Sequence, residues 1–195
     1  MNKPKAYVIG TSVSSSLSPT IFQYWFKKYN ISAEYGYKEI DKKNFDKKIK
    51  TILKEKRLCG LNITIPFKER IKPYLNDTFV DEFIKPDDLP INCVTVNEDK
   101  RLFGTNTDWM GFNNSYIEFE KTNGRNRRGS AIVIGYGGAA KAIIFVLKQM
   151  GFKKIKVFNR TFPDIKKLNQ IEDKKYSTIE MYKLEELNKH TNHKE

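Results

Sequence analysis

Residues 130–140 read S-A-I-V-I-G-Y-G-G-A-A, and this stretch decides the fold. An apolar run of strand length ends at Gly135, and helical spacing of apolar residues begins directly after the glycines. The small residues follow the G-x-G-x-x-G/A spacing, with Ala140 last. In that spacing Gly135 permits a tight turn, Gly137 lets the backbone approach a pyrophosphate, and the helix N-terminus faces the phosphates. The stretch therefore predicts a strand–turn–helix unit that binds a dinucleotide. A glycine turn that only packs a helix on a strand is the alternative.

The next strand carries the signal for the type of dinucleotide. An acidic residue about 20 residues past the glycines would bind the ribose hydroxyls of NAD, but the strand at 154–158 is followed by Asn-Arg-Thr. A guanidinium pairs with a 2′-phosphate, whereas a carboxylate repels it. Asp164, a turn later, is the feature that argues for NAD. The sequence predicts NADP(H), bound by Gly135, Gly137, Gly138, Ala139, Asn159, Arg160 and Thr161.

The rest of the chain alternates strand and helix signals. Strands are predicted at 6–10, 33–40, 58–65, 91–96, 101–103, 131–135, 154–158 and 178–182, and helices at 18–29, 45–53, 66–71, 108–119, 139–150 and 163–168. This alternation is typical of the α/β class. We expect an N-terminal α/β domain with a mixed sheet at residues 1–120. A Rossmann-type nucleotide-binding domain is expected at 121–195, beginning with the basic connector 121–129.

Composition and charge limit the classes of function. The net charge is +13, but the 29 lysines and 7 arginines are spread along the chain and form no nucleic-acid-binding motif. No apolar run approaches the roughly 20 residues that span a bilayer, and Met1–Lys5 lack the apolar core of a signal peptide. We therefore expect a cytoplasmic protein with no nucleic-acid or membrane partner. Cys59 and Cys93 are interpreted as reduced core thiols, and His190 and His193 lie in a polar tail, so no metal site is predicted.

Four polar segments interrupt the apolar pattern of the N-terminal part. They are S-L-S-P at 16–19, N-I-T-I-P-F-K at 62–68, I-N at 91–92 and G-T-N-T-D-W-M-G-F at 104–112. Taken singly, each has an ordinary interpretation: Ser18 and Asp108 as helix N-caps, Asn92 as a turn residue and Lys68 as a solvated charge. Their order ahead of the glycine turn suggests a shared role.

With G-Y-G-G-A-A-K-A at 135–142 and N-R-T at 159–161, these segments make the chain resemble the shikimate dehydrogenase family from residue 8 to about residue 168. The resemblance implies NADPH-dependent reduction of 3-dehydroshikimate to shikimate in chorismate and aromatic amino-acid biosynthesis, by a monomer or homodimer. It also implies that Ser16 and Ser18 hold the substrate carboxylate. The residues implied to contact the ring hydroxyls are Thr64, Lys68, Asn92 and Asp108.

The resemblance further implies that Lys68 is the catalytic acid or base, with Asp108 beside it. The chemistry is sensible on its own terms. Hydride reduction of a ketone needs a proton for the forming alkoxide, and a nearby positive charge stabilises that alkoxide. A lysine beside a carboxylate can do both.

Three features depart from the family pattern. Ser15 stands where the family often has histidine, and Pro90 removes a backbone donor just before Asn92. Family members also continue well past residue 195, so we expect a nucleotide domain with an unpaired sheet edge and exposed apolar surface. The chain is then a fragment, an inactive form or one that a partner completes. The alternatives to an active NADP enzyme are a quinate/shikimate dehydrogenase using NAD, an inactive binding remnant and a basic nucleic-acid-binding protein.

Overall fold

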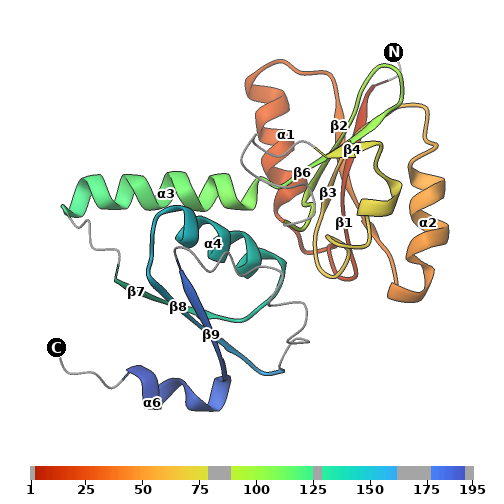
Figure 1. Cartoon of the computed structure of the whole chain (residues 1–195). Helices are drawn as coiled ribbons and strands as arrows, with labels where there is room; N and C mark the ends of the chain where they lie inside the picture. Colours follow the sequence, from red (N-terminus) through yellow and green to blue (C-terminus); the bar gives the residue numbers. More distant parts are fainter. Residues whose placement is uncertain (1–2, 79–88, 125–128, 162–176, 192–195) are drawn as a thin grey trace. The chain divides into compact units, whose positions relative to one another are not determined.

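The computed structural model describes residues 3–78, 89–124, 129–161 and 177–191. The chain forms two compact units (Figure 1). The first comprises Met1–Pro86 and Ile91–Asn106, and the second comprises Asp87–Pro90 and Thr107–Glu195. The predicted domain boundary after residue 120 stays a prediction. Asp164, His193 and the helix predicted at 163–168 lie outside the described residues.

The first unit is built on a mixed sheet of six strands in the order β2-β1-β3-β5-β6-β4. β1, the second strand in this order, runs parallel to β2 and β3, whereas β5 runs antiparallel to β3 and β6. The predicted α/β class with a mixed N-terminal sheet is therefore confirmed. The strands are β1 Lys5–Gly10, β2 Glu34–Glu39, β3 Leu58–Ile63, β4 Asp77–Thr78, β5 Cys93–Val96 and β6 Leu102–Thr105.

Two helices, α1 (Ser18–Lys28) and α2 (Phe45–Ile52), cover opposite faces of this sheet (Figure 1). Successive residues of a strand point to opposite faces, so Val8 and Ile9 of β1 belong to different cores. Val8 packs in a cluster with Phe22 of α1, and Ile9 packs in a larger cluster with Phe45 of α2. The alternation of the strand and the helical spacing of the two amphipathic segments together produce this three-layer arrangement.

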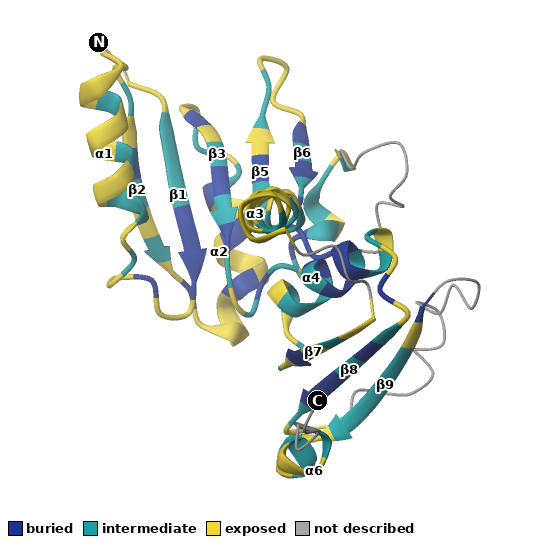
Figure 2. Cartoon of the chain, turned by 90° about the vertical axis from the view of Figure 1, so that its left-hand side faces the viewer, coloured by how far each residue is buried: buried dark blue, intermediate teal, exposed yellow. Residues whose placement is uncertain are grey.

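The second unit contains a parallel sheet of three strands in the order β7-β8-β9. The helix α4 follows the glycine turn, and its Ile144 and Leu147 pack on Val133 and Val157 of the sheet. Figure 2 shows the buried residues gathered along β8, the middle strand. The elements are α3 Asp108–Asn123, β7 Ser130–Ile134, α4 Gly138–Gln149, β8 Lys154–Asn159, β9 Thr178–Lys183 and α6 Leu187–Thr191.

The strand β7 has both a free edge, within the described residues, and exposed apolar side chains. Within the described residues, β7 pairs with β8 alone. Ile132 is 44% exposed and Ile134 is 64% exposed. Ile132 and Ile134 are two residues apart and share the face of the sheet opposite Val133, which packs with α4. Isoleucine on a strand is ordinarily buried, so this face carries apolar surface in contact with solvent.

Two local predictions are wrong, the helix at 66–71 and the core position of Cys59, and the structure adds 3₁₀ turns elsewhere. Residues 66–71 form turns followed by a 3₁₀ helix at Lys72–Tyr74, because the Lys68 carbonyl accepts its hydrogen bond from Ile91 N–H, outside the segment. The polar end forms a 3₁₀ turn at Leu184–Glu186, whose Glu186 carboxylate accepts from Lys183 N–H, and then α6. Another 3₁₀ turn, Lys42–Asn44, precedes α2.

Cys59 and Cys93 are unpaired as predicted, but Cys59 is exposed instead of lying in the core. Among the described helices, none is long and apolar enough to cross a membrane.

A substitution of Phe45 tests the larger core of the first unit, the cluster that also contains Ile9. Its side chain is fully buried and stacks on Phe67, with 4.3 Å between ring centroids. Phe45→Ala should lower the free energy of unfolding by about 3–5 kcal/mol, because it removes buried apolar surface and leaves a cavity. Urea denaturation followed by circular dichroism measures this change. The control Tyr24→Ala, at a side chain 61% exposed on α1, should shift it by less than about 0.5 kcal/mol. Equal losses would contradict the assigned core.

Candidate functional site

Three predicted site residues of the first unit are brought together by backbone hydrogen bonds. Ile63 N–H donates to the Asn92 carbonyl at 2.8 Å, and Ile91 N–H donates to the Lys68 carbonyl at 2.9 Å. The loop after β3, which carries Thr64 and Lys68, therefore runs beside the segment that carries Asn92. All three side chains are half-buried. The structure thus assembles Thr64, Lys68 and Asn92 at one end of the sheet.

Pro90 does not disrupt this loop. Leu89 and Pro90 are both buried, and the next two backbone donors are satisfied. Ile91 N–H donates to Lys68 and Asn92 N–H donates to the Thr105 carbonyl at 3.2 Å. The proline removes only a donor that this arrangement does not need.

Gly10 allows the end of β1 to approach Thr64. Thr64 N–H donates to the Ile9 carbonyl at 2.9 Å. A Cβ at position 10 would lie 2.6 Å from Val13 Cγ1 and 2.7 Å from Thr64 Cγ2. Contacts that short do not occur between real side chains, so a larger residue would displace Val13 or Thr64. Glycine is required here by the close packing of two loops.

The loop after β1 is anchored by one carboxylate. Glu39 Oε1, at the end of β2, accepts hydrogen bonds from Val13 N–H and Ser14 N–H, each at 2.9 Å. These hydrogen bonds hold the pKa of the Glu39 carboxyl below its ordinary value, and the bond from the Ser14 backbone contributes most. This anchor holds the segment leading into Ser16 and Ser18.

Ser16 and Ser18 lie together at the start of α1. Ser18 N–H donates to Ser16 Oγ, and Ser16 Oγ donates to Ser18 Oγ, each at 3.2 Å. Leu17 occupies the N-cap position and makes no side-chain cap hydrogen bond. The interpretation of Ser18 as an ordinary N-cap is therefore wrong. The two hydroxyls lie beside the N-terminus of α1, whose positive dipole end favours a carboxylate.

Sequence reasoning missed Tyr35 and the side chain of Asn62. The Tyr35 hydroxyl donates to Asn62 Oδ1 at 2.6 Å, and burial raises the pKa of Tyr35 to about 12. The alternating pattern at 33–40 could have placed Tyr35 on the inner face of β2, but nothing in the pattern indicates its partners. This bond connects β2 to β3.

Asp108 lies in the second unit, at the first helical residue of α3. Thr107 occupies the N-cap position, and no side chain caps this helix either, so the N-cap interpretation of Asp108 is also wrong. Lys68 belongs to the first unit. The pairing of Lys68 with Asp108 stays a prediction.

The glycine turn has the geometry expected of a phosphate-binding turn. Gly135 has φ +94°, a value that favours glycine, and its N–H donates to the Phe158 carbonyl at 2.7 Å. Gly137 precedes α4 without a side-chain cap. A Cβ at position 135 or 137 would meet no protein atom within 4 Å. Space therefore lies over the turn where a pyrophosphate could approach the N-terminus of α4, and the residues present fit a dinucleotide.

The end of β8 lies beside this turn, since Phe158 bonds to Gly135. Asn159 Nδ2 donates to the Thr161 carbonyl at 2.6 Å and shapes the short turn after the strand. Arg160, inside that turn, is exposed. The predicted cofactor residues are thus gathered at the carboxyl ends of two neighbouring parallel strands, where dinucleotides bind in α/β sheets.

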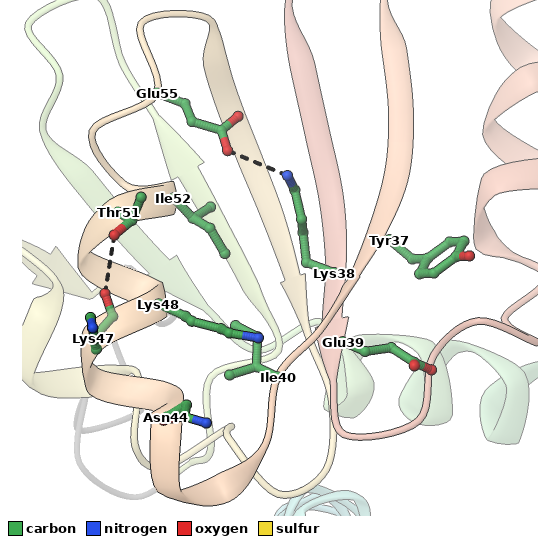
Figure 3. A pocket seen from close by; sticks show the side chains of 10 residues that line it. All are labelled: Tyr37, Lys38, Glu39, Ile40, Asn44, Lys47, Lys48, Thr51, Ile52 and Glu55. Atoms are coloured by element: carbon green, nitrogen blue, oxygen red, sulfur yellow. Dashed lines mark hydrogen bonds and ion pairs between the residues drawn. The ribbon is translucent and has the colours of Figure 1, made fainter.

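A separate groove of about 580 Å³ lies between β2 and α2 (Figure 3). The Lys38 ammonium and the Glu55 carboxylate form an ion pair at 3.5 Å inside it, and Lys48 extends from α2 toward Ile40. None of the predicted site residues lines this groove. Glu39, which anchors the loop before Ser16, also lines the groove.

Comparisons with known proteins point to one family. The profile of the shikimate dehydrogenase substrate binding domain matches residues 8–81, and that of shikimate / quinate 5-dehydrogenase matches residues 119–195. The chain is 37% identical to a shikimate dehydrogenase (NADP(+)) of Pelagibacter ubique over 170 residues, which are 87% of this chain and 59% of that protein. It thus spans about three fifths of the length of that relative.

Solved structures agree with this assignment. The crystal structure of shikimate dehydrogenase from Thermotoga maritima superposes with a TM-score of 0.73 at 32% identity, covering 95% of this chain and 64% of that one. The enzyme from Thermus thermophilus, crystallised in complex with shikimate, gives a TM-score of 0.66 at 28% identity, covering 81% and 57%. The order of motifs, the two sheets and these matches lead to one conclusion: the chain belongs to the shikimate dehydrogenase family.

Proposed function

We propose that this chain carries the substrate site and the NADP(H) site of an enzyme that reduces 3-dehydroshikimate to shikimate in chorismate biosynthesis. The observation that carries the proposal is the cluster of Thr64, Lys68 and Asn92, held by backbone bonds at the carboxyl end of β3. It lies in the same unit as the Ser16–Ser18 pair. Residues 1–120 form the substrate-binding and catalytic domain in this proposal, and residues 121–195 form the nucleotide-binding domain.

The proposed substrate recognition follows from the polarity of two groups of side chains. One is the pair of serines, and the other is the cluster of Thr64, Lys68 and Asn92. The Ser16 and Ser18 hydroxyls and the N-terminus of α1 suit a carboxylate, because each offers donors or a positive dipole end. Thr64, Lys68 and Asn92 suit hydroxyls, because they supply both donors and acceptors. A small molecule with a carboxylate and several ring hydroxyls matches this division, and shikimate is such a molecule.

Lys68 performs the proton transfer. When bound, NADPH supplies the hydride that turns the substrate carbonyl into an alkoxide. The Lys68 ammonium donates a proton to that alkoxide oxygen and stabilises its negative charge before the transfer. In the reverse direction the neutral amine accepts the hydroxyl proton. Asp108 is assigned the role of orienting this lysine.

The residues that follow β8 favour NADP over NAD. Arg160 is an exposed guanidinium beside the glycine turn and can pair with a 2′-phosphate. The similar protein of Pelagibacter ubique carries NADP(+) in its name. Because the chain spans about three fifths of that relative, binding of shikimate and NADP is the first property to measure.

Lys68→Ala tests the proton transfer. The variant should lower kcat for shikimate oxidation by about 10²–10⁴, the usual contribution of a positioned acid–base group, and leave the affinity for NADP unchanged. Formation of NADPH, followed by its absorbance, gives kcat, and calorimetry gives the affinity. Lys47→Ala, at an exposed lysine of α2, is the matched control and should retain the wild-type rate. An unaltered kcat in Lys68→Ala would remove this lysine from the mechanism.

The same assay separates the alternatives. Turnover with quinate and NAD in place of shikimate and NADP would favour the quinate/shikimate dehydrogenase. Binding of NADP and shikimate without turnover would favour the inactive remnant. Absence of binding for both ligands would refute the proposed function of this chain.

Arg160→Ala tests cofactor choice. Losing charge-assisted hydrogen bonds to the 2′-phosphate should weaken NADP binding by about 10- to 100-fold, since such bonds contribute about 1.5–3 kcal/mol. NAD lacks that phosphate, so its affinity should change little. Titration calorimetry with both cofactors measures the ratio, and Arg101→Ala, on the first unit, is the control. An equal loss of affinity for NADP and for NAD would show that Arg160 does not bind the 2′-phosphate.

A further inference from the structure

Glu39 is fixed on the sheet at the point where the loop from β1 to α1 begins. It is the last residue of β2, where it pairs with Gly10, the last residue of β1. Just beyond this pair, Ile40 N–H donates to the Gly10 carbonyl at 2.9 Å. Figure 3 shows the Glu39 carboxylate pointing away from Ile40 and Lys48. The backbone of Glu39 is thus held by strand pairing, while its side chain is free to reach the loop.

A series of hydrogen bonds leads from this carboxylate to the proposed substrate-carboxylate site. Glu39 Oε1 accepts from Val13 N–H and from Ser14 N–H, each at 2.9 Å. The Val13 carbonyl accepts from Ser16 N–H at 3.1 Å. Ser16 Oγ in turn accepts from Ser18 N–H at 3.2 Å, at the start of α1. Each bond restrains the residue that makes the next one, so the position of the Ser16 hydroxyl is coupled to Glu39.

Apolar packing restrains only one residue of this loop. Val13 is 4% exposed and belongs to the cluster that contains Val8, whereas residues 11, 12, 14 and 15 are all exposed. An exposed segment with few buried contacts opens at a low cost in free energy. The two bonds to Glu39 come from the neighbouring strand, and they therefore select one conformation of a loop that packing alone leaves weakly determined.

The charge of Glu39 has two effects of opposite sign. Its pKa lies below the ordinary value, chiefly because of the bond from the Ser14 backbone, so the carboxyl is ionised at neutral pH. Hydrogen bonds to an ionised acceptor are stronger than those to a neutral one, which strengthens the hold on the loop. The same charge repels a substrate carboxylate through space. The sign of a measured change in affinity therefore separates the two effects.

We propose that Glu39 is a positioning residue for the substrate carboxylate, acting through the loop that carries Ser16; this inference rests on the proposed function. The Glu39 carboxylate holds the amides of Val13 and Ser14, and the bond from Ser16 to Val13 then places the Ser16 hydroxyl beside the N-terminus of α1. Without this acceptor the loop adopts several conformations. The substrate then has to order the loop when it binds, which lowers its affinity.

Titration calorimetry of the full chain with shikimate tests this role. Glu39→Ala should weaken shikimate binding by about three- to tenfold, the range for loss of one hydrogen bond. Glu39→Gln keeps an acceptor oxygen at the same reach and should weaken it by less than about threefold, since only the charge is lost. Glu34→Ala removes the same charge from an exposed residue at the other end of β2 and should leave the affinity unchanged. The affinity for NADP should be the same in all variants.

Several outcomes would overturn the proposal. Tighter shikimate binding by both Glu39 variants would show that Glu39 acts only through its charge. An equal loss in Glu39→Ala and Glu39→Gln would show that the acceptor oxygen is not what matters. A matching fall in NADP affinity would mark a general loss of structure, and an unchanged affinity for shikimate would remove Glu39 from substrate binding.

A double-mutant cycle checks that the effect passes through Ser16. Once Ser16→Ala has removed the hydroxyl, a displaced loop has less to lose at the substrate carboxylate. Adding Glu39→Ala to this variant should therefore weaken shikimate binding by a smaller factor than it does in the wild-type chain. A full additional loss would contradict a role that acts through Ser16.

The wild-type protein keeps this proposal separate from the proposed function. If the wild-type chain does not bind shikimate, the proposed function fails, and the role of Glu39 fails with it. If the wild-type chain binds shikimate and Glu39→Ala binds it equally well, only the role of Glu39 fails. Circular dichroism of each variant shows that it is folded before the titrations are compared.

Discussion

The close approach of Gly10 to Thr64 is the constraint on which the first unit depends. β1 and its neighbour β3 end side by side, and the missing side chain at position 10 lets their following loops touch. One loop leads to Ser16 and Ser18, and the other carries Thr64 and Lys68. Because both leave the carboxyl ends of parallel strands, polar residues far apart in sequence meet at one edge of the sheet.

The second unit also gathers its predicted site residues at the carboxyl ends of parallel strands, but the groups it presents differ. Gly135 ends β7 with a positive φ, and its amide bonds to the last buried residue of β8. The turn and the segment with Arg160 are thereby adjacent. The first unit gathers hydroxyls, an amide and an ammonium group around one end of its sheet, whereas the second presents backbone amides and a guanidinium. A hydroxylated carboxylic acid suits the former set, and a phosphorylated dinucleotide suits the latter.

Local patterns predicted most elements because the signals were local. The apolar spacing of α2 and α4, the alternation of β2 and the glycine turn each depend on residues within a few positions of one another. The segment at 66–71 failed for the opposite reason. Its Lys68 carbonyl bonds to Ile91, a residue distant in sequence, and this bond competes with the helix that the proline seemed to begin. Similarly, Cys59 looked like a core residue because its neighbours are apolar, yet it is exposed on its strand.

The sequence by itself determined the α/β class, the phosphate-binding turn, the segments that carry polar site residues and their resemblance to one family. These follow from residue type and short spacing. Only the tertiary structure decided which side chains meet. The hydrogen bond from Tyr35 to Asn62 joins β2 and β3, and no short pattern encodes it. A hydrogen bond needs a distance and an angle between atoms, and the packing of Phe22 on Tyr35 supplies both.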